Sequence, residues 1–313
     1  MAKIILYISR LKWMIFILLI TLAVFALYSC GGSGVSDSSS AGGGVGGTGR
    51  YTGVITGFGS IFVNGLEFQT HSASIRIDDN DASESDLKIG MKVTVQAVDG
   101  IASSVMFEPE VKGQVTNKGV NSFQVMGLTV IVNSETKYEG ITSLAQLENG
   151  NFVEVSGFFN SSDELIAALV EKESSNSGAQ IQGIVSNHDP GNKIFKIYSI
   201  TVDYSFIGNP PAISDGDFVE AEGTFNGSEL IASELEVVDF EDNAGKDIEI
   251  EGIITQLTSQ GDFSINGQRI QTHAQTKFEH GTTGDIAVDV KIKAKGTVNS
   301  SGILIADKIE FED

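Results

Sequence analysis

Apolar and polar positions alternate with a period of two along most of the chain beyond residue 50. In the clearest case, Ile61 and Val63 precede Asn64-Gly65, and Leu66-Glu67-Phe68 follow. Alternation on both sides of Asn-Gly predicts a β-hairpin with a two-residue type I′ turn. Side chains two apart in a strand lie on one face, so Ile61, Val63 and Phe68 are predicted core residues.

This hairpin pattern occurs four times, with Phe123, Phe195 and Phe263 in the place of Ile61. A glycine-led strand precedes each hairpin, and two further apolar strands follow it. The glycines that open the first strands are Gly53, Gly113, Gly183 and Gly252. Repetition of one supersecondary unit predicts four modules, which we place at residues 50–110, 111–175, 176–240 and 241–313.

About five strands per module, tight turns and no long helical pattern predict an all-β protein. The expected fold is a tandem array of small antiparallel β-barrels with an OB-like (oligonucleotide/oligosaccharide-binding-like) topology, because closure removes exposed sheet edges. A flatter sandwich or a continuous β array is the alternative. Short helices are expected in the loops at residues 83–87 and 143–147.

The N-terminus has the plan of an export signal, with Lys3, Arg10 and Lys12 before an apolar run from Trp13 to Tyr28. The tetrapeptide Leu27-Tyr28-Ser29-Cys30 resembles the lipobox of bacterial lipoproteins. That resemblance implies that residues 1–29 are removed and that Cys30 carries acyl chains such as palmitate, which attach the protein to the membrane. Residues 30–49, mostly Gly, Ser, Ala and Val, are expected to be a flexible tether. An ordinary signal peptide with an incidental cysteine is the alternative.

The chain is acidic, with 41 Asp and Glu against 20 Lys and Arg, a net charge of −21. Nucleic-acid binding depends on clustered basic residues, and no basic run follows the signal segment. We therefore exclude nucleic acid as a partner and expect the acidic surface to act mainly in solvation.

The run Gly-Val-Ile-Thr-Gly-Phe-Gly-Ser-Ile-Phe-Val-Asn-Gly at residues 53–65, followed by Leu-Lys-Ile-Gly-Met-Lys-Val at 87–93, resembles the bacterial family catalogued as domain of unknown function 5666. The second and fourth modules carry a weaker form of the signature, with Thr136-Lys137-Tyr138 and Thr276-Lys277-Phe278. The resemblance implies export, lipidation and repetition. It implies no catalytic residue.

Several polar residues are weak candidates for metal ligands. His71 and His273 end equivalent Gln-Thr-His triplets, and imidazole is a common metal ligand. Asp79, Asp81 and Ser83 lie in an acidic loop rich in the oxygen ligands that calcium prefers. Exposed strand ends and a solvated turn are the simpler interpretations. No catalytic motif and no cofactor site is recognisable, so we predict that the protein is not an enzyme.

Exposed aromatic rings can hold a sugar or a protein partner, and Phe62, Phe158, Phe159 and Phe225 are candidates for such a role. The predicted function is that of a non-catalytic envelope lipoprotein, on the periplasmic face of an outer membrane or on the cell surface. Its modules would act as a spacer or bind protein or carbohydrate. The alternatives are an envelope enzyme or accessory subunit with a site between modules, and modules stabilised by calcium.

Cys30→Ala is expected to abolish incorporation of labelled palmitate and to weaken membrane attachment, because the acyl chains provide the anchor. Metabolic labelling and fractionation of cells that produce either form measure both effects. If the variant stays as firmly in the membrane fraction as the unaltered protein, a lipid anchor at Cys30 is wrong.

Overall fold

The computed structural model describes residues 48–174, 178–238 and 244–312, which belong to one compact unit, Gly43–Asp313. These residues form 23 β-strands and three short 3₁₀ helices, so the prediction of an all-β protein is confirmed. None of the helices in this part of the chain has the length and apolar character that crossing a bilayer requires. The predicted signal segment, Cys30 and nearly all of the predicted tether lie outside the described residues.

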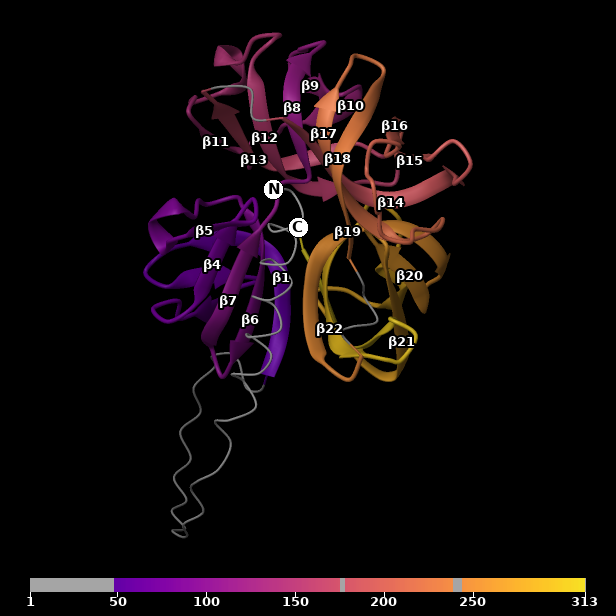
Figure 1. Cartoon of the computed structure of the whole chain (residues 1–313). Coiled ribbons are helices and arrows are strands. Elements are labelled where there is room, and N and C mark those ends of the chain that lie inside the picture. The colour runs from indigo at the N-terminus through magenta and orange to yellow at the C-terminus, as the bar shows by residue number, and fades with distance from the viewer. Residues whose placement is uncertain (1–47, 175–177, 239–243, 313) are drawn as a thin grey trace, which may run out of the picture. The chain divides into compact units, whose positions relative to one another are not determined.

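The strands follow the chain in four sets, which we call the four repeats (Figure 1). The first repeat contains β1 (Thr48–Gly57), β2 (Ile61–Val63), β3 (Leu66–Phe68), β4 (Ser74–Ile77), β5 (Asn80–Ala82), η1 (Glu84–Asp86), β6 (Lys92–Val98) and β7 (Ile101–Phe107). The second contains β8 (Val111–Thr116), β9 (Ser122–Val125), β10 (Leu128–Ile131), β11 (Lys137–Glu139), η2 (Leu144–Gln146), β12 (Phe152–Phe159) and β13 (Leu165–Glu173).

The third repeat contains β14 (Ala179–Asp189), β15 (Ile194–Ile197), β16 (Ile200–Asp203), β17 (Phe218–Phe225) and β18 (Glu229–Val238). The fourth contains β19 (Asp247–Ser259), β20 (Asp262–Ile265), β21 (Gln268–Glu279), η4 (Thr283–Asp285), β22 (Lys291–Val298) and β23 (Leu304–Phe311). The short helices predicted in the loops at 83–87 and 143–147 are η1 and η2.

All four predicted hairpins form. The turn residues Asn64-Gly65, Met126-Gly127 and Asn266-Gly267 have positive φ at both positions, as a type I′ turn requires. In the third repeat only Tyr198 of Tyr198-Ser199 has a positive φ. The side chains predicted to point inward are at most 2% exposed and line the cores. They are Ile61, Phe123, Phe195 and Phe263, then Val63, Val125, Ile197 and Ile265, and Phe68, Val130, Val202 and Ile270.

The predicted strand-opening glycines lie inside the first strands instead, because each strand begins several residues earlier. A Cβ atom at Gly252 would lie 2.3 Å from Ile265 Cγ2, and one at Gly183 would lie 2.5 Å from Ile197 Cγ2. In the third and fourth repeats, the residue before the hairpin turn thus packs directly over this glycine and leaves no room for a side chain there.

Strand pairing within each repeat returns to its starting strand. In the fourth repeat, β19 pairs with β20 and β20 with β21; β21 then runs parallel to β23, and β22 joins β23 back to β19. The second and third repeats have the same sequence of pairings. In the first repeat, β4 and the bridge between Gln69 and Ile101 supply the contact with β7.

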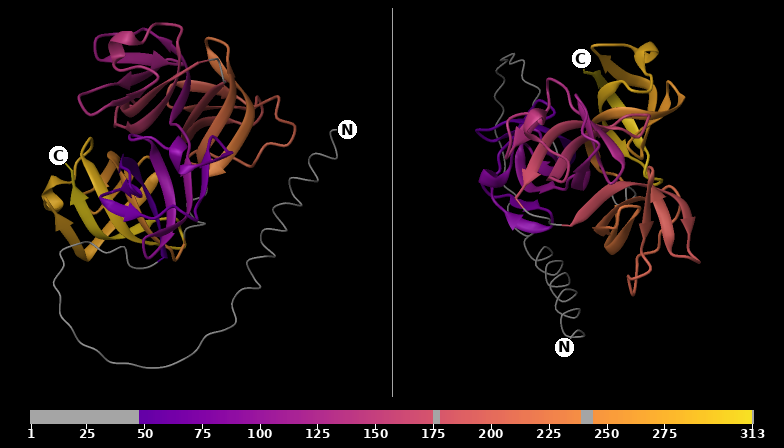
Figure 2. Two further views of the ribbon diagram at one scale, coloured as in Figure 1. Left: turned by 90° about the vertical axis from the view of Figure 1, so that its left-hand side faces the viewer. Right: turned by 90° about the horizontal axis from the view of Figure 1, so that it is seen from above.

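The repeats are not separate barrels, and that part of the prediction is corrected. β1 pairs in parallel with β19, which joins the first and fourth repeats in a 12-stranded sheet, and β8 pairs with β14, which joins the second and third repeats in an 11-stranded sheet. Figures 1 and 2 show the first repeat beside the fourth and the second beside the third. The second and third repeats also share one apolar core.

The opening halves of the first strands make these junctions. Residues Gly49 to Thr52 of β1 pair with β19, whereas Ile55 and Gly57 pair with the hairpin strand β2. A first strand that extends beyond its own hairpin therefore offers free backbone groups to the next repeat. The sequence repeat does not contain this information.

Candidate functional site: an acidic cavity where the repeats meet

The junction between the second and third repeats aligns polar side chains in a row across six strands. Register pairing links Glu171 to Glu154, Glu154 to Lys112, Lys112 to Gln180, Gln180 to Glu222 and Glu222 to Glu234. Residues that are paired in register point to the same side of a sheet. Gln182, Glu220 and Glu236 form a second row beside it. Both rows face outward from the apolar cores.

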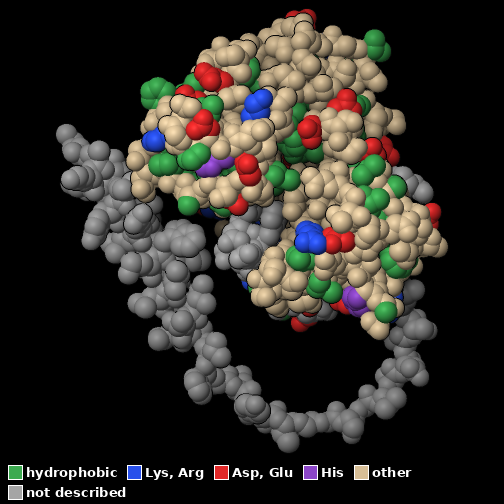
Figure 3. Space-filling model, turned by 90° about the vertical axis from the view of Figure 1, so that its right-hand side faces the viewer, with side chains coloured by type: hydrophobic (Ala, Val, Ile, Leu, Met, Phe, Trp, Pro, Cys, Tyr) green, Lys and Arg blue, Asp and Glu red, His purple; other side chains and the backbone are tan. Residues whose placement is uncertain are grey.

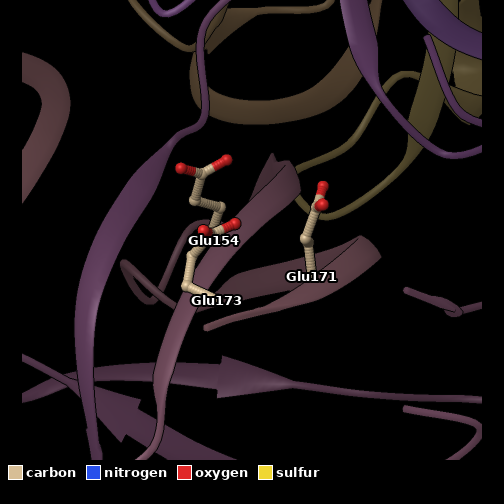
Figure 4. A group of neighbouring side chains, drawn as sticks. All are labelled: Glu154, Glu171 and Glu173. Atoms are coloured by element: carbon tan, nitrogen blue, oxygen red, sulfur yellow. The ribbon is translucent and has the colours of Figure 1, made fainter. Parts of the chain in front are cut away.

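Glu154, Glu171 and Glu173 at one end of the first row have carboxylate oxygens within 4.8 Å of one another. Figure 4 shows the three side chains on β12 and β13. Lys112 Nζ lies 2.5 Å from Glu154 Oε1 and also contacts Asp78, while Lys88 contacts Glu171. Burial raises the pKa of Glu154 to about 7, against the opposing effect of Lys112. The lysines thus already neutralise part of this charge.

A cavity of about 250 Å³ lies between the outer faces of the repeats. Its walls come from all four repeats, with Phe158 from the second and Phe218 from the third among the apolar side chains. Six lining residues are acidic and two are basic; the acidic ones are Asp79, Glu108, Glu220, Glu236, Glu249 and Glu251, and the basic ones are Arg50 and Lys92. A concave, largely apolar site with a few convergent polar groups is the usual form of a small-molecule site.

Half of these carboxylates have basic partners. Asp79 pairs with Arg76 at 2.9 Å, Glu251 with Lys291 at 2.5 Å and Glu249 with Lys295 at 3.6 Å. Among the described residues, no ion pair is formed by the other three, Glu108, Glu220 and Glu236. Unneutralised negative charge is therefore concentrated where β7, β17 and β18 meet.

Burial and mutual repulsion shift the pKa values of these groups. Burial raises the pKa of Glu108 to about 7, although the backbone N–H of Asp79 donates a hydrogen bond to its Oε1 at 3.1 Å. Burial and the charges of Glu108, Glu222 and Glu236 raise the pKa of Glu220 to about 8. Near neutral pH these carboxyls are therefore poised between their charged and neutral forms.

The other end of the cavity is neutralised and well bonded. Lys92 and Lys291 Nζ lie 5.7 and 5.0 Å from the centre of the Phe158 ring, within the range of cation–π attraction. Lys92 also pairs with the buried Glu110, whose Oε2 accepts a hydrogen bond from Gly157 N–H at 2.7 Å. Glu251 Oε2 accepts one from Val54 N–H at 2.9 Å, which ties the first repeat to the fourth.

The structure does not gather the weak metal candidates into one site. His71 is exposed in the first repeat, and His273 lies in the fourth, where its ring contacts Gln275 and Asp307. Asp79 pairs with Arg76, Asp81 is exposed in β5, and Ser83 caps η1 through a hydrogen bond to Asp86. The one carboxylate group of metal-binding size in the described part of the chain contains none of these five residues.

The aromatic candidates are not exposed platforms. Phe158 and Phe159 are 8% and 2% exposed, so the prediction of exposed rings is wrong for these two residues; Phe62 and Phe225 are half-buried. Phe158 lies outside the core that the second and third repeats share, beside Lys92 of the first repeat and Lys291 of the fourth. Phe158 nevertheless lines the cavity, so a residue chosen as a binding candidate lies in the candidate site.

The cavity glutamates were missed. Their signal in the sequence is the alternation of β17 and β18, in which Glu220 and Glu222 oppose Glu236 and Glu234 across a strand pair. Four carboxylates on two adjacent strands are unfavourable unless something compensates them. Acidic side chains are common and basic ones sparse on the face drawn in Figure 3, in keeping with the net charge of −21.

Comparison with known proteins identifies a family whose model matches three of the four repeats. Residues 49–104, 112–171 and 251–310 match the model of a family described as "Domain of unknown function (DUF5666)". These segments are the first, second and fourth repeats; the third has the same strand pairing without a match. No curated protein matches the chain.

The raised pKa of Glu220 predicts that stability falls as the pH rises from about 5 to 9. The folded state holds this proton up to a pH of about 8, whereas an unfolded glutamate loses it near its ordinary value of 4.5, so the stabilisation present at low pH is lost across that window. Glu220→Gln should flatten the decline and raise the free energy of unfolding at pH 9 by about 2 kcal/mol.

Chemical denaturation at pH 5, 7 and 9 measures this effect. Glu67→Gln, at an exposed position outside the cavity, is the matched control and should leave the decline unchanged. An unaltered pH dependence in Glu220→Gln would show that Glu220 is not held in its neutral form.

Proposed function

Because this chain belongs to the family described as "Domain of unknown function (DUF5666)", we propose a function from its own geometry: a non-catalytic, lipid-anchored envelope protein that binds a small ligand where its repeats meet. Anchoring at Cys30 and export remain inferences from the N-terminal sequence. Under this proposal, the binding unit lies on the periplasmic face of an outer membrane or on the cell surface.

The observation that carries this proposal is the cavity of about 250 Å³ with unpaired carboxylates at one end and Phe158 in its wall. A spacer needs no such cavity, and partial burial of Glu108 and Glu220 without a basic partner costs stability. A ligand that neutralises the charge of these carboxylates would offset that cost. The volume is just below the usual range for drug-sized ligands, about 300–1,000 Å³, and suits a compact molecule.

We further infer that each repeat is an OB-like barrel, joined to its neighbour by the opening half of its first strand. Support comes from the cyclic pairing order, in which the third strand runs parallel to the fifth and the fourth pairs with the first. In this arrangement the ligand occupies the space between outer barrel faces and not a barrel interior.

Two alternatives each have one supporting observation. An envelope enzyme is favoured by Glu108 and Glu220, because carboxyls with pKa values of about 7 and 8 suit general acid catalysis, although no histidine is among the described residues that line the cavity. Calcium-stabilised modules are favoured by the group of Glu154, Glu171 and Glu173. Turnover of a bound compound would identify the first alternative, and a melting temperature raised by calcium would identify the second.

Thr94→Trp is expected to remove ligand binding, because Thr94 lines the cavity from the outer face of β6 and a larger side chain would fill it. Gln96→Trp is the matched control, since Gln96 is exposed two residues along the same strand face and does not line the cavity. Native mass spectrometry of each protein after incubation with a small-molecule extract of the envelope measures retained ligands.

The proposal requires a compound that the unaltered protein and Gln96→Trp retain and Thr94→Trp loses. Equal retention by all three proteins, with unchanged melting temperatures, would mean that the cavity is not a binding site.

A further inference from the structure

We propose that the cavity binds an organic cation, namely a primary ammonium group on an apolar stem. This inference rests on the proposed function and specifies its ligand. Charge, hydrogen-bonding capacity and the apolar wall of the cavity support it independently.

The charge argument comes from a comparison between repeats. The fourth strands of the third and fourth repeats share a β-bulge, at Gly223 and at Gly296, which aligns them residue by residue. Lys293 and Lys295 of β22 thus occupy the positions of Glu220 and Glu222 of β17. In the fourth repeat these lysines pair with glutamates of the same face, Lys293 with Glu310 and Lys295 with Glu249.

The third repeat carries glutamates in place of those lysines and keeps acidic neighbours on β18. The outer face of the third repeat therefore carries carboxylates at the positions where the fourth repeat carries lysines that neutralise its own glutamates. Lys112, the nearest basic side chain of the polar row, is already bound to Asp78 and Glu154. A cation from outside the chain would supply the missing charge.

The hydrogen-bond argument concerns acceptors. Gln268 Oε1 is buried in the cavity wall and receives no hydrogen bond within the described residues, whereas the Glu108 carboxyl lies beside the side-chain amide of Gln180. Gln268 is 1% exposed, and its Nε2 donates to the carbonyl oxygens of Arg269 and Gly302 at 2.9 and 2.7 Å, which fixes the amide orientation. A ligand that satisfies Gln268 Oε1 must donate a hydrogen bond, and an ammonium has three N–H donors and no acceptor.

The apolar wall distinguishes an organic cation from a metal ion. Met106, Phe158, Phe218 and Ile253 line the same cavity, and these side chains offer no ligand to calcium or magnesium. They can cover the methylene groups of an alkylamine, as protein surfaces cover the stem of a lysine side chain. The cavity therefore suits a molecule with one charged end and an apolar body.

The site also predicts the pH dependence of binding. Asp78, Asp79, Glu222 and Glu236 surround Glu108 and Glu220. Arg76 and Lys112 are nearby cations, and Arg50 and Lys92 line the same cavity. A bound ammonium stabilises the charged form of Glu108 and Glu220. Binding should therefore release protons at pH values where these two carboxyls are partly protonated. Affinity should rise from pH 6.0 to 8.5, below the pKa of an alkylamine, about 10.4.

Isothermal titration calorimetry of the chain from residue 43 to 313 with 1,5-diaminopentane tests the proposal. We expect binding that is at least tenfold tighter at pH 8.5 than at pH 6.0 and at least tenfold weaker in Glu220→Gln. Glu67→Gln should bind as the unaltered chain does. The neutral 1,5-pentanediol and calcium chloride should not compete. Nα-acetyl-lysinamide as a second titrant distinguishes a lysine side chain from a free amine as the source of the ammonium.

Pentanediol binding as tightly as diaminopentane, or diaminopentane binding equally to Glu220→Gln, would overturn the cationic ligand. The cationic ligand would also be overturned if no amine binds while Thr94→Trp still loses a compound that Gln96→Trp retains. The cavity would then remain a binding site, but for another class of molecule. If Thr94→Trp retains the same compounds as the unaltered protein, the proposed function itself is refuted.

Discussion

Backbone pairing between repeats is the interaction on which the rest of the structure depends. A closed ring of strands leaves no free edge, so neighbouring repeats pair only where a first strand extends beyond its hairpin. Residues Gly49 to Thr52 of β1 do this with β19, and Lys112 of β8 does it with Gln180 of β14. These short pairings turn the outer faces of the repeats toward one another, and surfaces that face water in an isolated module become the walls of a cavity.

The polar groups on those faces then need partners. The fourth repeat resolves this with lysines and glutamates on adjacent strands, such as Lys293 and Glu310. In the second repeat, Glu154 pairs with Lys112 of the same repeat and Glu171 pairs with Lys88 of the first repeat. The third repeat does not resolve it, because Glu220 faces Glu236 and neither forms an ion pair in the described part of the chain. The same fold thus produces a neutralised face in one repeat and an uncompensated acidic one in another.

The local structure could be predicted from the sequence, because hairpins and their cores depend on neighbouring residues. Asn64-Gly65 and the alternation around it determine turn type, register and the buried face. The site could not be predicted, because it depends on which repeats pair. Phe158 shows the difference: it was a candidate for an exposed ring, but contact with other repeats buries it. His71 and His273 occupy equivalent places in their repeats, and sequence equivalence did not bring them together.

Hydrogen exchange at the junctions tests the central claim most directly. The relevant backbone amides are those that donate across the junctions within residues 49–52 of β1, 247–250 of β19, 111–112 of β8 and 180–181 of β14, because the other amides of these segments face a strand of their own repeat. If the sheets continue between repeats, these amides are protected as strongly as strand amides within a repeat, such as those of β12 and β13. Exchange as fast as that of the exposed loop residues Val120 and Phe206 would contradict the account and restore a chain of independent modules.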